Sequence, residues 1–211
     1  MKESFFNKNA SIIVYDLIGA IAANKQYLSD IDGEIGDGDH GINMNKGFSL
    51  CKERISESMT GSECFKVLAD TLMKDVGGSM GPLYGTFFYM VYEGTKNKEQ
   101  ITAGDFQRIL KKICAEVSDI GGAKLGDKTL LDCLFPATEA FTAGLERGFS
   151  VALESMKEAA VIGKDATKEM LAGIGRASRL GERSRGHIDA GAASCCVILC
   201  SMADSIQKIL K

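Results

Sequence analysis

The chain has 211 residues, of which 45% are hydrophobic and 25% charged, and its formal net charge at pH 7 is −3. This length allows one large domain or two small ones, and the composition is that of a globular protein rather than a disordered one. Because the basic residues are scattered along a slightly acidic chain, the sequence offers no electrostatic footprint for DNA or RNA. We therefore expect no nucleic acid partner.

The N-terminus and the cysteines indicate the expected cellular compartment. The first ten residues, MKESFFNKNA, lack the apolar run of a signal peptide, and no stretch approaches the roughly 18 apolar residues of a membrane helix. The seven cysteines include no CxxC pair and mostly fall at apolar positions of helical patterns. We expect a cytoplasmic protein without a membrane partner, in which the cysteines are buried free thiols.

Apolar residues repeat at helical spacing along almost the whole chain. In chain order, the predicted helices cover residues 12–23, 44–59, 65–76, 83–92, 106–117, 129–145, 151–174 and 192–210. Thr102 or Asp105 can cap the fifth helix, and Pro136 predicts a kink or a later start in the sixth. No run alternates between apolar and polar residues as a strand does, and no repeat or linker divides the chain. The sequence predicts an all-α fold of eight helices in one domain, residues 1–211.

The loops between these helices are of two kinds. Short connections make consecutive helices antiparallel neighbours, so alternate loops lie at the same end of the bundle. The loops that follow the odd-numbered helices are rich in glycine and include both histidines of the chain, whereas the other loops carry nothing chemical. The glycine-rich loops are residues 28–40, 77–81, 121–127 and 181–191. We expect a functional site at the end where these loops converge.

The first of these loops carries an unusual concentration of acidic residues. The stretch "DIDGEIGDGDHG", residues 30–41, holds four aspartates, one glutamate, one histidine and four glycines. Carboxylates this close repel one another unless they face water or share a cation. They are hard oxygen ligands for Mg²⁺, and glycine-rich loops at helix N-termini offer N–H groups to phosphates. The loops predict a metal-nucleotide site, although the same residue types also suit four solvated turns.

The residues of these loops match neither of two common ligand-binding motifs. An EF-hand starting at Asp30 would have Ile35 at its glycine position and Gly41 at its glutamate position. In "GGAKLGDKT", Gly121 and Gly126 have the spacing of a P-loop, but Asp127 stands where lysine must follow and no strand precedes it. Neither a calcium hand nor a Walker motif is present.

Four motifs together closely resemble one family. They are "DIDGEIGDGDHGINMNKGF", "GGSMGPLYGTFF", "GDKTLLDCLFPA" and "GERSRGHIDAGAAS". Their order and spacing resemble the nucleotide-binding L subunits of dihydroxyacetone kinases over essentially the whole chain. The resemblance implies an up-and-down barrel of eight antiparallel helices with the nucleotide site at one end.

The resemblance also implies a set of site residues. It implies that two Mg²⁺ ions are bound by Asp32, Asp37 and Asp39. It implies that ADP or ATP is contacted by His40, Gly41, Ile42, Asn43, Ser79, Met80, Gly121, Leu130, Arg176, Asp189, Ala190 and Gly191. A core position is the alternative for Leu130. His40 and His187 are as well suited to orienting a loop through hydrogen bonds as to contacting the ligand.

By the same resemblance, the chain is expected to be half of an enzyme. Phosphoryl transfer needs positioning and charge stabilisation, so no side-chain nucleophile is required here. The implied reaction passes a phosphoryl group from phosphoenolpyruvate, through a phosphotransferase-system M subunit, to dihydroxyacetone held on a separate K subunit. By analogy with free-standing L subunits, ADP is expected to remain bound as a lasting cofactor. A homodimer is left open.

Departures from the family pattern keep two alternatives open. Met80, Ala190 and Ala193 stand where the family often has serine, proline and threonine, and Arg185 replaces a usual aliphatic residue. Loss of a hydroxyl and of the φ restraint of proline is expected to weaken nucleotide retention. One alternative is an L-type subunit of an ATP-dependent kinase for another short sugar. The other is a non-catalytic, nucleotide-bound regulator that docks onto a transcription factor.

Overall fold

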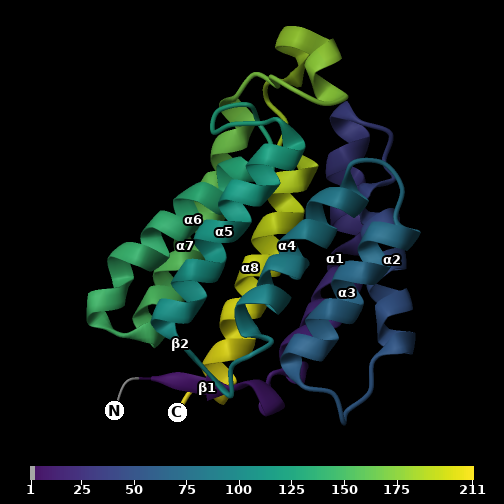
Figure 1. Ribbon diagram of the computed structural model, residues 1–211. Helices are drawn as coiled ribbons and strands as arrows, with labels where there is room; N and C mark the ends of the chain where they lie inside the picture. The colour runs from purple at the N-terminus through teal and green to yellow at the C-terminus, as the bar shows by residue number, and fades with distance from the viewer. Residues whose placement is uncertain (1–2) are drawn as a thin grey trace.

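Figure 1 shows the computed structural model of the chain, which describes residues 3–211. Over these residues the chain forms eight α-helices, and the predicted all-α fold class is confirmed. The helices are α1 (Ser11–Ile35), α2 (His40–Arg54), α3 (Gly61–Asp75), α4 (Met80–Thr95), α5 (Ala103–Gly121), α6 (Leu131–Gly144), α7 (Phe149–Ala166) and α8 (Ala190–Ile209). Pro136 lies inside α6, which begins two residues later than the apolar pattern predicted.

The helices form a closed ring. Each helix packs against its neighbours in sequence, and α8 packs against α1 as well as α7, which closes the barrel. The interior is rich in aromatic side chains, among them Phe48, Phe87, Phe88 and Phe141, each of them completely buried. Burial of one such side chain stabilises the fold by about 1.5 to 3 kcal/mol. The cysteines are free thiols, and all but the partly buried Cys200 are buried, as expected.

Every helix begins and ends at least one residue away from its predicted bounds, and the largest differences are at the C-terminal ends of α1, α2 and α7. Helix α1 continues to Ile35, so Asp32 lies in its last turn rather than in a loop. Helix α2 ends at Arg54, one residue before Ile55 of the predicted apolar stripe. Helix α7 ends at Ala166, because Leu171 and Ile174 extend the helical spacing but are 40% and 38% exposed and pack on no core. The chain continues from α7 through two short 3-10 helices, η3 (Thr167–Glu169) and η4 (Ala177–Ser184).

A small sheet, which the sequence did not predict, closes the end of the barrel where both termini lie (Figure 1). Strands β1 (Ser4–Phe6) and β2 (Gln100–Thr102) pair antiparallel, with Phe5 opposite Ile101. Each strand has three residues, too few to show an alternating pattern. The fold is therefore all-α with one short two-stranded sheet among the described residues.

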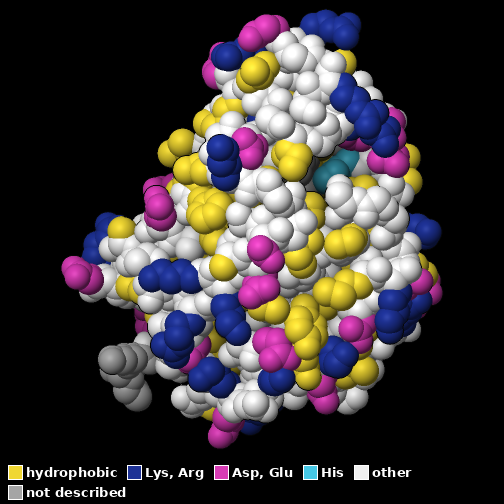
Figure 2. Space-filling view, turned by 45° about the horizontal axis from the view of Figure 1, so that its top comes forward, with side chains coloured by type: hydrophobic (Ala, Val, Ile, Leu, Met, Phe, Trp, Pro, Cys, Tyr) yellow, Lys and Arg dark blue, Asp and Glu magenta, His cyan; other side chains and the backbone are white. Residues whose placement is uncertain are grey.

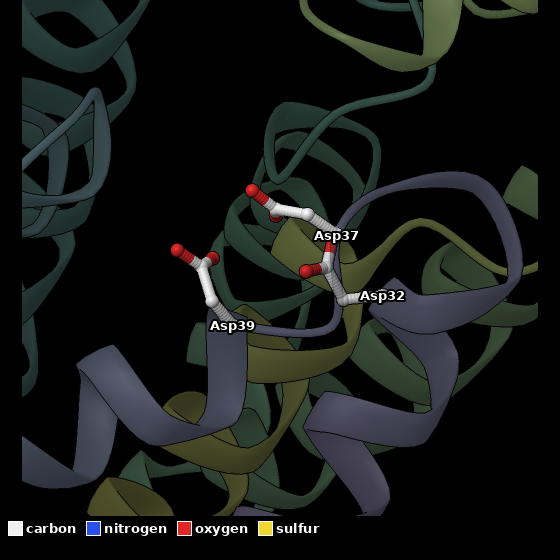
Figure 3. A group of neighbouring side chains, drawn as sticks. All are labelled: Asp32, Asp37 and Asp39. Carbon is white, nitrogen blue, oxygen red and sulfur yellow. The ribbon is translucent and has the colours of Figure 1, made fainter.

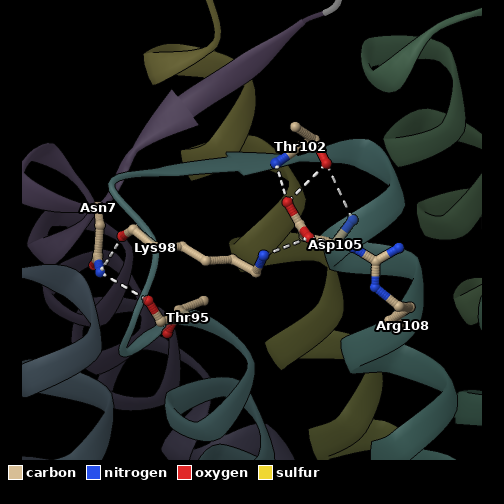
Figure 4. A network of polar contacts seen from close by, with 6 residues as sticks. All are labelled: Asn7, Thr95, Lys98, Thr102, Asp105 and Arg108. Atoms are coloured by element: carbon tan, nitrogen blue, oxygen red, sulfur yellow. Dashed lines mark hydrogen bonds and ion pairs between the residues drawn. The ribbon is translucent and has the colours of Figure 1, made fainter.

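Polar contacts complete this end of the barrel (Figure 4). Thr102 caps α5 in a capping box with Asp105, one of the two residues that the sequence offered for this cap. Asp105 also contacts Lys98 and Arg108. The side-chain amide of the buried Asn7 donates to the Thr95 and Lys98 carbonyls, each at 3.0 Å. These contacts use the polar groups at this end within the protein itself.

Helix α8 departs from the expectation that no segment is apolar enough for a membrane span. By length and composition alone this helix, Ala190–Ile209, could cross a membrane. In the fold, 67% of its apolar window is buried and it packs against α1, α6 and α7. Its composition is that of a core helix.

Candidate nucleotide and metal site

The loops that follow α1, α3, α5 and α7 meet at one end of the barrel, at the top of Figure 1. They surround a cavity of about 580 Å³. Figure 2 tilts this end toward the viewer and shows a hollow in which a histidine is visible, with basic side chains nearby. Of the residues predicted for the site, the lining includes Asp32, His40, Ser79, Met80, Gly121, Leu130, Arg176, Asp189, Ala190 and Gly191.

Three carboxylates gather beside this cavity (Figure 3). Asp32 comes from the last turn of α1, Asp37 from the connecting turn and Asp39 from the residue before α2. One oxygen from each lies within 4.8 Å of the others. Burial raises the pKa of Asp39, and the negative charge of Asp37 raises it further. Carboxylates that repel one another in this way gain from a shared divalent cation, so the donor set fits Mg²⁺.

The tight turn between α1 and α2 depends on glycine at two positions. Gly38 has a φ of +76°, a conformation that other residues rarely adopt. At Gly36, a Cβ atom would lie 2.2 Å from Oδ1 of Asp32. The glycines thus let the chain reverse within reach of the Asp32 carboxylate, which places the three aspartates side by side.

An arginine and a histidine side chain reach the acidic turn from the segment between α7 and α8. The guanidinium of Arg176 forms an ion pair with Asp37. The imidazole Nδ1 of His187 lies 2.8 Å from a carboxylate oxygen of Glu34. His187 does not line the cavity, and the contact with Glu34 is the loop-orienting role that the sequence left open for it.

His40 is held in a buried hydrogen-bonded chain beneath the cavity. Its Nε2 lies 2.8 Å from the Ser194 hydroxyl, which in turn lies 2.5 Å from the Tyr84 hydroxyl. Burial lowers the pKa of His40 to about 4, although the nearby Asp32 carboxylate acts in the opposite direction. The imidazole is therefore neutral near pH 7, and its bond to Ser194 orients it against α8.

Three predicted residues follow His40 but do not line the cavity. Gly41 packs against α1, where a Cβ atom would lie 2.0 Å from the Lys25 carbonyl oxygen. Ile42 is 52% exposed, and the Asn43 N–H donates to the Asp39 carbonyl at 2.9 Å. What these residues bring to this end of the barrel is the backbone of the first turn of α2.

Two helices that begin at this end, α2 and α4, lack a side-chain cap on their N-cap residue, whereas α8 is capped by Asp189, which accepts from the Ala192 N–H at 2.7 Å. Neither Asp39, which precedes α2, nor Ser79, which precedes α4, accepts a capping hydrogen bond through its side chain. The first turns of a helix carry N–H groups without intrahelical partners and a partial positive charge. Two such turns facing one cavity are suited to binding phosphate oxygens.

The other side of the cavity is apolar. Leu130 lines it and is 6% exposed, so this residue is both part of the core and a wall of the site. Leu83, Ile120 and Met80 lie on the same lining. A polar wall opposite an apolar one is typical of sites for ligands with a charged and an aromatic part.

The sequence reasoning missed two charged residues where α5 connects to α6, namely Lys128 in the loop and Asp132 in the first turn of α6. Asp132 is buried and accepts hydrogen bonds from the N–H groups of Gly126, at 2.6 Å, and Thr129, at 2.7 Å. Lys128 is also buried and lines the cavity. Both stand beside the apolar run of "DKTLLDCLF", and charged residues in such a position could have been taken as a sign of buried polar contacts.

Comparisons with known proteins agree on one family. A family model described as the DAK2 domain matches residues 34–204. The chain is 38% identical over 177 residues to the ADP-binding subunit of the PEP-dependent dihydroxyacetone kinase of Escherichia coli, covering 82% of this chain and 84% of that protein. It is 39% identical over 176 residues to the corresponding ADP-binding subunit from Lactococcus lactis, with the same coverage of both chains.

A solved structure shares the fold. The dihydroxyacetone kinase of C. freundii, in complex with AMP-PNP and Mg²⁺, matches with a TM-score of 0.67 and 21% sequence identity. The match covers 93% of this chain and 33% of that one. At this identity the likeness concerns the helical fold.

Proposed function

This chain belongs to the DAK2 domain family, and from that premise we propose that it is the ADP-binding subunit of a phosphoenolpyruvate-dependent dihydroxyacetone kinase. The resemblance stated from four sequence motifs is thereby confirmed at the level of the family. The observation that carries the function is the meeting of three carboxylates beside a cavity lined by uncapped helix N-termini. That combination suits a nucleotide diphosphate and its divalent cations.

Asp32, Asp37 and Asp39 hold two Mg²⁺ ions in this proposal. Bound there, Mg²⁺ supplies charge neutralisation of the phosphate oxygens during phosphoryl transfer. The aspartates contribute carboxylate oxygens that face the same space. Arg176 pairs with Asp37 in the structure and is placed to supply a further positive charge to the phosphates.

The remaining residues bind and orient the nucleotide. The first turns of α2 and α4 offer N–H groups to the diphosphate, beside Ser79 and Met80. Gly121 and Leu130, on the apolar wall, pack against the adenine and ribose. Asp189, Ala190 and Gly191, where α8 begins, close the cavity from the other side.

The proposed partners follow from the same family. A K subunit holds the ketose, and a phosphotransferase-system M subunit recharges the bound ADP from phosphoenolpyruvate. No residue of this chain acts as the nucleophile, so the reaction requires both partners. The chain is proposed to work in the cytoplasm, as a single domain over residues 1–211.

Two experiments test this function. Mass spectrometry and metal analysis of the denatured protein should release ADP and magnesium. The protein mixed with a K subunit, an M subunit and phosphoenolpyruvate should phosphorylate dihydroxyacetone. Phosphorylation of another short ketose instead would favour the related sugar kinase, and bound nucleotide without any transfer would favour a regulator.

A further inference from the structure

The segment that covers the cavity, residues 167–189, has almost no apolar core of its own. We call it the closing segment; it joins α7 to α8 and carries Arg176 and Asp189. Within it only Thr167, Ala172 and Ser184 are buried. Hydrophobic burial therefore contributes little to its position, and polar contacts must decide where it lies.

One buried ammonium group supplies four of the hydrogen bonds that join this segment to the rest of the chain. Lys128 is 2% exposed, and its side chain reaches from the loop between α5 and α6 into the base of the closing segment. Its Nζ donates to the backbone carbonyls of Thr167 at 2.8 Å, Met170 at 3.3 Å, Ser184 at 2.7 Å and His187 at 2.6 Å. Two of these acceptors lie at the start of the segment and two at its end. The lysine thus joins the start and the end of the closing segment to the loop between α5 and α6.

The charge of Lys128 is satisfied by carbonyl groups rather than by an acid. Among the described residues, no carboxylate oxygen lies within 4.0 Å of its Nζ. Burial lowers the pKa of Lys128, while the charges of Asp189 and Glu169 act against that shift. A buried ammonium without acceptors is costly, and hydrogen bonds from a charged donor are stronger than those from a neutral one. The ammonium group therefore holds the four carbonyl groups in place, and these carbonyl groups in turn fix the ammonium.

The loop that presents Lys128 is itself fixed. Lys128 has a φ of +61°, and Asp132 holds the residues on both sides of it through the N–H groups of Gly126 and Thr129. The same loop receives a hydrogen bond from the closing segment, from the Gly173 N–H to the Asp127 carbonyl at 2.9 Å. The ammonium is thus delivered to the segment from a rigid support.

We propose that Lys128 is a positioning residue that fixes the closing segment over the cavity and thereby sets how fast a nucleotide leaves. The inference rests on the nucleotide-binding function proposed above. Because the ammonium donates to backbone carbonyls of the segment, it acts on the ligand through Arg176 and Asp189.

Proteolysis of the ligand-free protein tests the structural half of this proposal. The closing segment contains Arg176, Arg179, Arg183 and Arg185, so an arginine-specific protease reports how often it opens. In Lys128→Met, which keeps the stem of the side chain and removes its donors, we expect cleavage at these arginines to be at least tenfold faster. The matched control is Lys124→Met, an exposed lysine of the same loop, which should leave the rate within twofold.

Nucleotide exchange tests the functional half. With a fluorescent ADP analogue and Mg²⁺, Lys128→Met should release the nucleotide at least tenfold faster, while the association rate stays within twofold. A general loss of structure would not give this split between the two rates. The circular dichroism spectrum of Lys128→Met should show the same helical content as that of the wild type.

Two results would overturn the proposal. One is cleavage and release by Lys128→Met at rates within twofold of the wild type. The other is loss of helical content in that variant, because the lysine would then support the barrel rather than the segment. A wild-type protein that fails to bind Mg-ADP would instead reject the proposed function, and the cleavage comparison would still decide whether Lys128 fixes the segment.

Discussion

The two ends of the barrel differ in whether the N–H groups at their helix N-termini have side-chain partners. At the end that holds the chain termini, α3 and α5 begin with capping boxes, and the Glu3 carboxylate accepts from the first two N–H groups of α7. At the cavity end, α8 is capped by Asp189, but α2 and α4 begin without a side-chain cap. The closed end uses its polar groups to stabilise the fold, whereas the cavity end leaves groups available to a ligand.

The charges differ in the same way. At the closed end, Asp105 lies between Lys98 and Arg108, both within ion-pair distance. At the cavity end, the carboxylate oxygens of three aspartates lie close together. In the described structure only one of the three, Asp37, forms an ion pair with a basic side chain. An arrangement that is poor for stability but well placed for a cation is typical of a binding site. Substitutions should therefore affect ligand binding at one end and folding at the other.

Asp37→Asn should break the binding side of this comparison. We expect at least a hundredfold loss of Mg²⁺-dependent ADP affinity, about 2.7 kcal/mol, with little change in the melting temperature of the ligand-free protein. Isothermal titration with ADP and Mg²⁺ measures the loss. Asp30→Asn is the matched control, since Asp30 is exposed on α1, two residues before Asp32, but outside the cluster. Unchanged affinity in Asp37→Asn would contradict the metal site.

Asp105→Ala should break the folding side. It removes the half of the α5 capping box that accepts from the Thr102 N–H, together with the contacts to Lys98 and Arg108, so we expect about 2 to 3 kcal/mol of destabilisation in urea denaturation. ADP binding to the folded variant should stay within twofold of the wild type. A large loss of ADP affinity at a temperature where the variant is folded would show that the two ends are not independent.

The pH dependence of stability sharpens the contrast at the closed end. Burial disfavours the charged form of Asp105, but hydrogen bonds from the Thr102 N–H and hydroxyl and from Lys98 outweigh it and lower its pKa to about 2. A lowered folded pKa gives stability that is present above the unfolded value and lost as the pH falls from about 4 to 2. Thermal melts of the wild type should show this loss, and Asp105→Ala should reduce it.

Asp189, at the cavity end, should change the stability of the fold with pH in the opposite direction to Asp105. Burial raises its pKa to about 7, against the N–H group of Ala192 and the charge of Lys128. The folded state then binds the proton more tightly, so its stability falls as the pH rises from about 4 to 7. Because the carboxyl keeps part of its solvent contact, we expect about 1 to 2 kcal/mol over this interval. Asp189→Asn, which retains a capping oxygen, should flatten that part of the curve; an unchanged slope would assign it to another group.

Met80→Ser should give the smallest effect. Restoring a hydroxyl beside the first turn of α4 adds one donor near the diphosphate, and we expect about a threefold gain in ADP affinity, roughly 0.7 kcal/mol. Competition against a fluorescent ADP analogue is sensitive enough to measure it. Weaker binding would mean that the methionine side chain packs against the ligand.

Much of this architecture could be predicted from the sequence because it depends on local patterns. Apolar spacing located the helices, and the alternation of short and glycine-rich loops placed the unusual residues at one end. The acidic turn was visible because Asp37, Gly38 and Asp39 are adjacent. The same local reasoning failed at Leu171 and Ile174, which have helical spacing but lie outside any helix and are 40% and 38% exposed.

The sequence by itself determined the helices, the single end at which the loops converge and the identity of the acidic turn. Only the tertiary structure decided that α1 carries Asp32 to the turn, that Arg176 pairs with Asp37 across 139 positions of sequence, and that Lys128 binds carbonyls 39 to 59 positions away. The physical reason is that helical periodicity and turn chemistry act over a few residues. The contacts of a buried charge depend on which distant backbone groups the folded chain brings to it.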